Sequence, residues 1–420
     1  VPTEIFILGI EGDLTQRIPP HWLGQLRGEI VILSRSSYLK NLQLPPSIQI
    51  ASTHLFDEGY TKALMQAVTF DGPILVLASG DPAFFGPIPS LRRIFPEVPL
   101  HICPKPSSIS RAFGLLGMNW EDAAVISGVG RDLDLFEREL GGHLRLGVHK
   151  IAVLTSKTTP PSYVVQKIYE FSRTDYEIEI ATDLNHSSQA IYGAPFEMDE
   201  IDKKALAIVI AYQKDAKTRD SPAVSTSKLA DAFNPKSKRF SQFEFDSFGS
   251  MITKKEIREL VVGKIAPWRL PFGTLVLDIG AGSGSVGLEV ARQRPDLQLV
   301  AIERRHESIE IIKENASRLE LAIKVIEGDA IDYLDKISTP SSIFVGGGGT
   351  EILEEVVRLF GTKSIIVATS ATLENAQRTH DLLGNQVMAQ IYRTTPLGKS
   401  GNRIDGYNPV FISWNEKAQL

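Results

Sequence analysis

The chain has 420 residues, 43% of them hydrophobic, which predicts two or three globular domains with sizeable cores. Its formal net charge of −5 gives no general attraction to nucleic acid, and no apolar run is long enough to cross a membrane, so we expect neither partner. Because no signal peptide is visible and the one cysteine, Cys103, excludes an intrachain disulfide, we expect a cytoplasmic protein.

The first half of the chain alternates short apolar runs with helical segments, which predicts an α/β domain. Helices are expected over residues 109–116 and 162–171, the first of them capped by the serines that precede it. The expected strands are 4–9, 30–34, 74–78, 101–103, 151–155, 178–181 and 207–211.

Two loops that follow expected strands carry the distinctive residues of this half. They are ASGDPAFFG, from Ala78 to Gly86, and PSSISRA, from Pro106 to Ala112. With the Leu-Gly and Trp-containing stretch from Leu116 to Trp120, they resemble the tetrapyrrole methylases of cobalamin synthesis, specifically the precorrin-6Y methyltransferase type that methylates carbon 5. The resemblance implies a two-lobed α/β fold that binds S-adenosylmethionine (SAM) between its lobes. It marks as cofactor-binding Gly80, Asp81, Pro82, Phe84, Ser107 and Ser108.

This half departs from the family at two places. The first turn is GIEGD, from Gly9 to Asp13, where the family usually has G-x-G-x-G; and SGVGR, from Ser127 to Arg131, stands where the family usually has SLHGR. An alternative is therefore that the first half is a scaffold that binds the macrocycle without catalysis. The ASGDP segment read by itself would be only a strand end and a turn.

Residues 213–245 break the α/β pattern and are rich in Ser, Lys, Asp and Pro, which is typical of a surface linker. The short basic run of Lys236, Lys238 and Arg239 is expected to be a solvated part of it, the alternative being a contact to an acidic substrate.

The second half opens with a predicted helix that extends through Val262. Thr253 stands at the N-cap position and Glu256 follows three residues later, the spacing of a capping box.

The next element, LVLDIGAGSGSVGLEV from Leu275 to Val290, combines a strand, a glycine turn and a helix with Ser285 as its expected N-cap. Glycines allow positive φ and let a ligand approach the backbone, and the helix start offers free N–H groups to an anion. Asp278, Gly280, Gly282 and Gly284 are therefore candidate cofactor-binding residues.

Two more acids follow the next two apolar runs. Glu303 ends the run 299–302 at a distance that suits a carboxylate on ribose hydroxyls, and Asp329, beside Ala330, follows 324–326 and would hold an adenine amino group. Three acids placed in this way resemble the class I SAM methyltransferases, which have a Rossmann-like fold. NAD or another nucleotide, or a purely structural glycine turn, remain alternatives.

Four glycines, Gly346 to Gly349, follow the expected strand 342–345. The IFVGGGG run, the MITKKEIR segment from Met251, the TSATLE segment from Thr369 and the PLGK segment from Pro396 resemble the carbon-15 methyltransferases of the same pathway. This resemblance implies that Gly346 and Gly347 bind cofactor, and we consider Lys254 and Tyr407 as proton donors for a decarboxylation. It places on the substrate Thr253, Lys254, Lys255, Arg258, Gly348, Lys399 and Arg403.

The two halves occur in the order of a known fused family, the precorrin-6Y C(5,15)-methyltransferases (decarboxylating). The resemblance implies a carbon-5 domain at 1–212, a linker at 213–245, and a domain at 246–420 that methylates carbon 15 and decarboxylates the carbon-12 acetate of precorrin-6B or its cobalt form. It implies two SAM per turnover, a tetrapyrrole substrate and a homo-oligomer, and no metal-ligand spacing is present among the eight histidines. An RNA or protein methyltransferase is the remaining enzymatic alternative.

Overall fold

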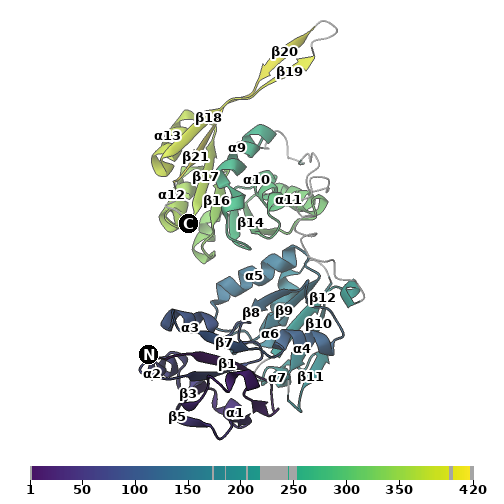
Figure 1. Ribbon diagram of the computed structural model, residues 1–420. Coiled ribbons are helices and arrows are strands. Elements are labelled where there is room, and N and C mark those ends of the chain that lie inside the picture. Colours follow the sequence, from purple (N-terminus) through teal and green to yellow (C-terminus); the bar gives the residue numbers. More distant parts are fainter. Residues whose placement is uncertain are drawn as a thin grey trace. The chain divides into compact units, whose positions relative to one another are not determined.

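The computed structural model describes residues 2–172, 175–184, 186–204, 207–217, 245, 253–396 and 401–416 (Figure 1). The chain divides into two compact units. The first comprises Val1–Leu133, His149–Gln166 and Tyr176–Ser221, and the second comprises Asp134–Val148, Lys167–Asp175 and Pro222–Leu420. Most of the expected linker, including its basic run, lies outside the described residues. Within the described ranges, no helix has the length and apolar character needed to span a bilayer.

The first unit begins with a parallel five-stranded sheet, which forms because β1 and β6 consist almost entirely of buried apolar residues. Helices α2 (Tyr60–Ala67) and α3 (Ile88–Ile94) pack on this sheet, and α1 (Ser36–Leu39) is a single turn. The strand order is β5 (Ile48–Leu55), β3 (Gly28–Ser34), β6 (Ile74–Ser79), β1 (Ile5–Ile10) and β7 (Leu100–Cys103).

A second, mixed sheet completes the first unit and confirms the two-lobed α/β organisation. Helix α4 (Ser108–Leu115) packs its apolar face against β12, while α6 (Pro161–Phe171) and α7 (Met198–Ile201) connect the strands. Only β8 and β9 pair in parallel. The strand order is β11 (Ala190–Gly193), β10 (Glu177–Thr182), β12 (Ala207–Tyr212), β9 (Lys150–Leu154) and β8 (Ala124–Ser127).

The second unit contains a seven-stranded sheet with the Rossmann-like order expected of a class I methyltransferase. Its first five strands are parallel, and β21 is antiparallel to both of its neighbours. The order reverses at β13, which lies between β14 and β16, so a ligand crevice is expected at the carboxyl ends there. The strand order is β15 (Lys324–Glu327), β14 (Gln298–Glu303), β13 (Leu275–Ile279), β16 (Ser342–Val345), β17 (Ile365–Ser370), β21 (Val410–Trp414) and β18 (Asn385–Ala389).

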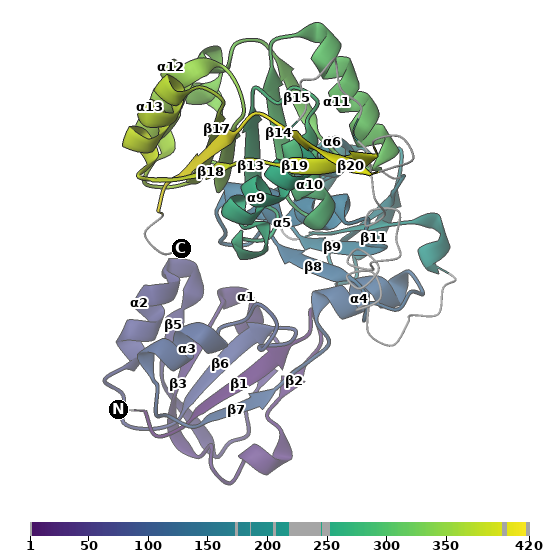
Figure 2. The same ribbon diagram turned by 90° about the horizontal axis from the view of Figure 1, so that it is seen from above.

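Helices cover both faces of this sheet (Figures 1 and 2). Helices α9 (Lys255–Ile265), α10 (Ser285–Gln293) and α11 (His306–Arg318) share one apolar cluster with the sheet. Helices α12 (Gly349–Phe360) and α13 (Leu373–Leu383) share the cluster on the other face. A two-stranded hairpin of β19 (Tyr392–Pro396) and β20 (Asn402–Gly406) extends beyond β18 and β21 (Figure 1).

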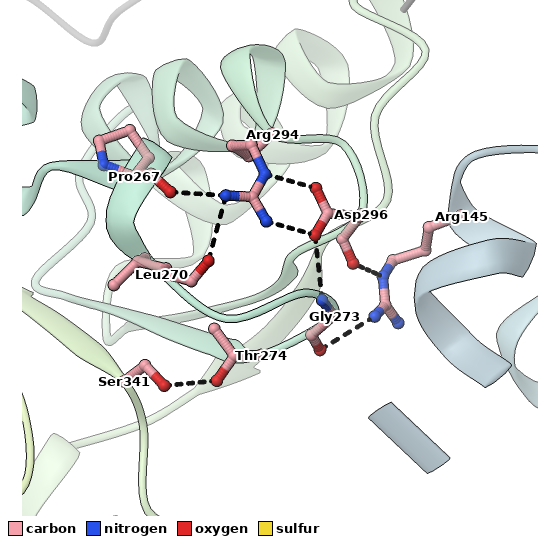
Figure 3. Close-up of polar contacts among 8 residues, drawn as sticks. All are labelled: Arg145, Pro267, Leu270, Gly273, Thr274, Arg294, Asp296 and Ser341. Carbon is pink, nitrogen blue, oxygen red and sulfur yellow. Dashed lines mark hydrogen bonds and ion pairs between the residues drawn. The ribbon is translucent and has the colours of Figure 1, made fainter. Parts of the chain in front are cut away.

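Helix α5 (Leu133–Arg145), which the sequence places in the first half, belongs to the second unit except for its first residue. Arg145 is 8% exposed and donates from Nε to the Asp296 carbonyl at 2.9 Å and from Nη2 to the Gly273 carbonyl at 3.3 Å. The Asp296 carboxylate is held in turn by both Arg294 and the Gly273 N–H (Figure 3). One turn earlier, a Cβ on Gly142 would lie 2.5 Å from the Phe272 ring, so a larger residue there would displace the ring.

The expected capping box at the start of α9 is wrong. The N-cap is Lys254, and no side chain caps the helix. The Glu256 carboxylate instead accepts two hydrogen bonds from Arg393 Nη2, at 2.7 and 3.0 Å. Because the helix begins after Lys254, Glu256 stands at the second helical position rather than the third, so it lacks the spacing of a capping box.

Candidate functional site

A cavity of about 250 Å³ lies in the second unit where β13, β14, β15 and β16 end. Its position is the switch point of the strand order, where open parallel sheets bind ligands. Seven of the residues singled out in the sequence line it: Gly280, Glu303, Asp329, Ala330, Gly346, Gly347 and Gly348.

The glycine turn after β13 is built on left-handed backbone conformations. Gly280, Gly282 and Gly284 have φ of +64°, +57° and +71°. A Cβ on Gly280 would lie 2.7 Å from the Gly347 Cα, so the two glycine loops touch backbone to backbone at the cavity. Gly284 is the N-cap of α10, one residue before the expected Ser285, because only a residue that tolerates positive φ fits there.

The Glu303 carboxylate joins this turn to the end of β14. It is 5% exposed, accepts the Gly282 N–H at 2.8 Å on one oxygen, and accepts the Arg304 and Arg305 N–H groups at 3.0 Å on the other. A carboxylate offers about four acceptor positions, so three backbone bonds leave room for a ligand hydroxyl. The geometry suits a residue that holds both the loop and a ribose.

Replacing Glu303 with glutamine should weaken the binding of S-adenosylhomocysteine (SAH) by at least about tenfold. Both oxygens of the Glu303 carboxylate accept backbone N–H groups, so the NH₂ group of glutamine would face an N–H donor, and the glycine turn would lose a charge-assisted hydrogen bond. Calorimetric titration measures this change. Glu307→Gln, an exposed carboxylate four residues on in α11, is the matched control. An affinity of the Glu303→Gln variant within twofold of the control would show that Glu303 does not support the cofactor.

Asp278 lies beneath the glycine turn and is 1% exposed, and it is not among the residues that line the cavity. One of its oxygens accepts the Gly287 N–H at 2.9 Å, and its Oδ1 has no hydrogen-bond partner in the described part of the chain. Burial raises the pKa of the Asp278 carboxyl to about 7. The hydrogen bond from the Gly287 N–H acts in the opposite direction and lowers this pKa, and the negative charge of Glu303 raises it further. Asp278 therefore fixes the junction of loop and helix, and its direct contact with a cofactor stays a prediction.

Asp329 and Ala330 stand at the cavity where β15 ends. Asp329 accepts the Ile331 N–H at 3.2 Å through Oδ1, which starts a short 3-10 turn over Ala330–Asp332. This bond restrains an exposed carboxylate at the cavity. The arrangement is compatible with the expected contact to an adenine amino group.

A second cavity of about 170 Å³ adjoins the first and shares Gly346 and Gly347 with it. It lies at the ends of β16 and β17, and its polar residues include Thr350, Thr369 and Ser370. The sequence marked the TSATLE segment only as a point of family resemblance, because hydroxyl residues carry no local signal of a binding site.

The two expected proton donors lie together at the base of the hairpin. The Lys254 ammonium stands 2.9 Å from the centroid of the Tyr407 ring, with Arg393 on β19 5.6 Å from the same centroid. Burial lowers the pKa of Lys254, and the positive charge of Arg393 lowers it further. Neither Lys254 nor Tyr407 lines the two cavities, so their role in proton transfer stays a prediction.

The other expected substrate contacts are dispersed. Arg258 is 7% exposed and donates to the carbonyl of Thr253 at 3.2 Å, so both are parts of the α9 packing rather than of a cavity. Lys255 is exposed, and Arg403 pairs with Asp405 at 3.0 Å on the hairpin. Lys399 lies outside the described residues.

In the first unit, the two predicted loops meet. Gly80 has φ of +58°, and a Cβ there would lie 3.0 Å from the Pro106 carbonyl. Asp81 accepts the N–H of Ala83 at 2.9 Å, and Ser107 caps α4 through the Ser110 N–H at 3.1 Å, as expected.

The remaining predicted positions adjoin these two loops. Ser108 is the first residue of α4. Phe84, two residues after Pro82, has its ring centroid 4.8 Å from the ring centroid of Phe85. In the divergent first turn, Glu11 forms an ion pair with Arg111 of α4.

Comparison with known proteins is consistent with this geometry. Residues 242–413 match the model of the precorrin methyltransferase domain family. A precorrin-6Y C(5,15)-methyltransferase (decarboxylating) of Sinorhizobium sp is 29% identical over 86% of this chain and 84% of its own. A probable cobalt-precorrin-6B C(15)-methyltransferase (decarboxylating) of Pyrobaculum aerophilum is 33% identical over 39% of this chain and 88% of its own.

Among solved structures, the C-terminal domain of precorrin-6Y C(5,15)-methyltransferase from Rhodobacter capsulatus is 27% identical over 40% of this chain and 92% of its own, with a TM-score of 0.37. The carbon-15 relative is matched along nearly all of its length, and relatives of the C(5,15) type are matched along most of this chain. The protein therefore belongs to the precorrin-6Y C(5,15)-methyltransferase (decarboxylating) family.

Proposed function

We propose that the protein is a bifunctional SAM-dependent C-methyltransferase of corrin ring synthesis. The second unit methylates carbon 15 and decarboxylates the carbon-12 acetate of precorrin-6B or its cobalt form, and the tetrapyrrole methylase half methylates carbon 5. The observation that carries the proposal is the cavity at the ends of β13 to β16, where Glu303 binds the glycine turn and the two glycine loops touch.

The residues present fit SAM. When bound, SAM supplies an electrophilic methyl group, and the electron-rich macrocycle supplies the attacking carbon, so the protein needs no strong nucleophile of its own. Its main contribution is orientation, which can provide roughly 7–11 kcal/mol in favourable cases. Glu303 and Asp329 hold the ribose and adenine, and Gly346 to Gly348 let the cofactor approach the backbone at the end of β16.

The first half has a second candidate function, that of a scaffold that binds the macrocycle without methylating it. The ion pair between Glu11 and Arg111 favours it, because it ties the divergent first turn to the helix that carries the paired serines. We retain two SAM per turnover as the leading proposal, which the close approach of Gly80 to Pro106 and Ser107 supports.

Calorimetric titration of the intact chain with SAH separates these proposals. We expect two sites per chain, one of which is lost in Gly282→Val, because valine is strained at a φ of +57° and the loop bond to Glu303 would break. A single site, lost in that variant, would assign the first half to the scaffold. Binding of tRNA at physiological salt, which we expect to be absent, would instead favour an RNA methyltransferase.

We further propose that the protein is a cytoplasmic homo-oligomer. The hairpin exposes Ile404 and Tyr392, by 71% and 60%, and apolar side chains so exposed favour a protein contact. Sedimentation of the intact chain tests this, and a monomer at micromolar concentration would contradict it.

A further inference from the structure

The second cavity, at the ends of β16 and β17, is not accounted for by the cofactor. It shares Gly346 and Gly347 with the cofactor cavity, so its occupant would lie next to the cofactor. With a volume of about 170 Å³, it has room for a short substituent of a larger substrate rather than for the substrate as a whole.

Several residues with hydroxyl groups line this cavity. Ser370 lines it, and its hydroxyl is shielded from solvent without a hydrogen-bond partner in the described part of the chain. A shielded hydroxyl without a partner costs free energy, which a ligand would recover by bonding to it. Thr350 and Thr369 belong to the same lining.

The start of α12 adds a preference for negative charge. The N-cap of this twelve-residue helix is Gly348, which supplies no side-chain cap, and Gly349 and Thr350 of its first turn line the cavity. The first N–H groups of a helix carry partial positive charge and bind carboxylates or phosphates. Together with Ser370, they form a site for a small anion.

The lining contains neither Lys, Arg nor His. An anion here would thus be held by neutral donors, without a cation that would stabilise it as a permanent ion pair. We propose that this cavity receives the acetate side chain that the substrate loses as carbon dioxide, with Ser370, Thr350 and the α12 amides as its ligands. The inference rests on the proposed function and assigns the decarboxylation to a place within the second unit.

The reaction is consistent with neutral donors. The bond between the methylene carbon and the carboxylate carbon breaks, its electron pair passes into the conjugated macrocycle, and the carboxylate leaves as carbon dioxide. The electron pair then returns to the methylene carbon, which takes a proton from water, leaving hydroxide, and becomes a methyl group. A counter-cation would stabilise the carboxylate more than the departing carbon dioxide and so slow the step, whereas neutral donors orient the carboxylate without this penalty.

The test uses the full chain with SAM and the metal-free macrocycle precorrin-6B, and follows methylation and carbon dioxide release separately by mass. In Ser370→Ala and in Thr350→Val, we expect carbon dioxide released per methyl group added at carbon 15 to fall at least about tenfold, while SAH affinity stays within twofold. Thr362→Val, an exposed threonine after α12, is the control and should keep the wild-type ratio.

An unchanged ratio in both variants, or a loss of SAH affinity in parallel with activity, would overturn the acetate subsite while leaving the proposed function in place. A wild-type chain that binds SAH and methylates no macrocycle would instead overturn the proposed function. Two variants on different elements, with melting curves compared with that of the control, separate the loss of a ligand contact from unfolding.

Discussion

Gly280→Val should abolish SAH binding in the second unit, with a loss of affinity of more than about a hundredfold. The valine Cβ would lie 2.7 Å from the Gly347 Cα. Because the atom that it meets belongs to the backbone, no flexible side chain can move aside to relieve the clash. The φ of +64° adds about 1–2 kcal/mol of strain for any residue with a Cβ. Both glycine loops would have to separate, which opens the cavity that they form together. Calorimetric titration of the intact chain measures this as the loss of one site.

Gly384→Val is the matched control for this prediction. Gly384 has φ of +84°, comparable strain for a substituted residue, yet no atom lies within 4 Å of the position of its Cβ. That variant should lose stability and keep both SAH sites. If Gly280→Val binds SAH as well as the control does, the contact between the two glycine loops does not form the cofactor site.

Stability of the second unit should depend on the Asp278 proton. Burial raises the pKa of Asp278 from 3.8 to about 7, so between pH 4 and 7 the folded protein holds a proton that the unfolded chain has lost. The free energy of unfolding then falls as pH rises, by about 1.4 kcal/mol per pH unit in this window, or about 4 kcal/mol in total. Asp278→Asn removes this dependence and keeps an acceptor for the Gly287 N–H.

Urea unfolding curves recorded from pH 4 to 8 test this. The variant should gain stability relative to the wild type as pH rises, and the difference should level off above pH 7. Asp335→Asn, an exposed acid in the same unit, should shift the curves little at any pH. A difference between Asp278→Asn and wild type that does not change with pH would show that Asp278 is ionised in the fold throughout this range.

The strands and the glycine cradle could be predicted because their signals are local. A buried parallel strand such as β13 is a continuous apolar run, and the residues at its carboxyl end lie at the switch point of the sheet. Edge strand β5, IQIASTHL, was missed because most of its side chains are not buried and show no clear alternation. Gly284 rather than Ser285 caps α10 because backbone conformation, not side-chain chemistry, decides that position.

Other features depend on residues far apart in the sequence. The capping box failed because α9 begins one residue later than expected, and the Glu256 carboxylate also pairs with Arg393, 137 residues away. The pKa of Asp278 depends on burial by the completed fold and on Glu303 from the neighbouring strand. The second cavity combines hydroxyls from β17 with the start of α12, and no spacing within either segment announces it.

The contacts of Arg145 bear on where a recombinant fragment of the second unit could begin. A recombinant fragment begun in the linker would omit α5, and with it the guanidinium that satisfies the Asp296 and Gly273 carbonyls and the glycine against which Phe272 packs. The second unit of this chain therefore depends on a helix from the first half of the sequence, and an excised version that keeps this packing needs α5 restored or the surface around Phe272 redesigned.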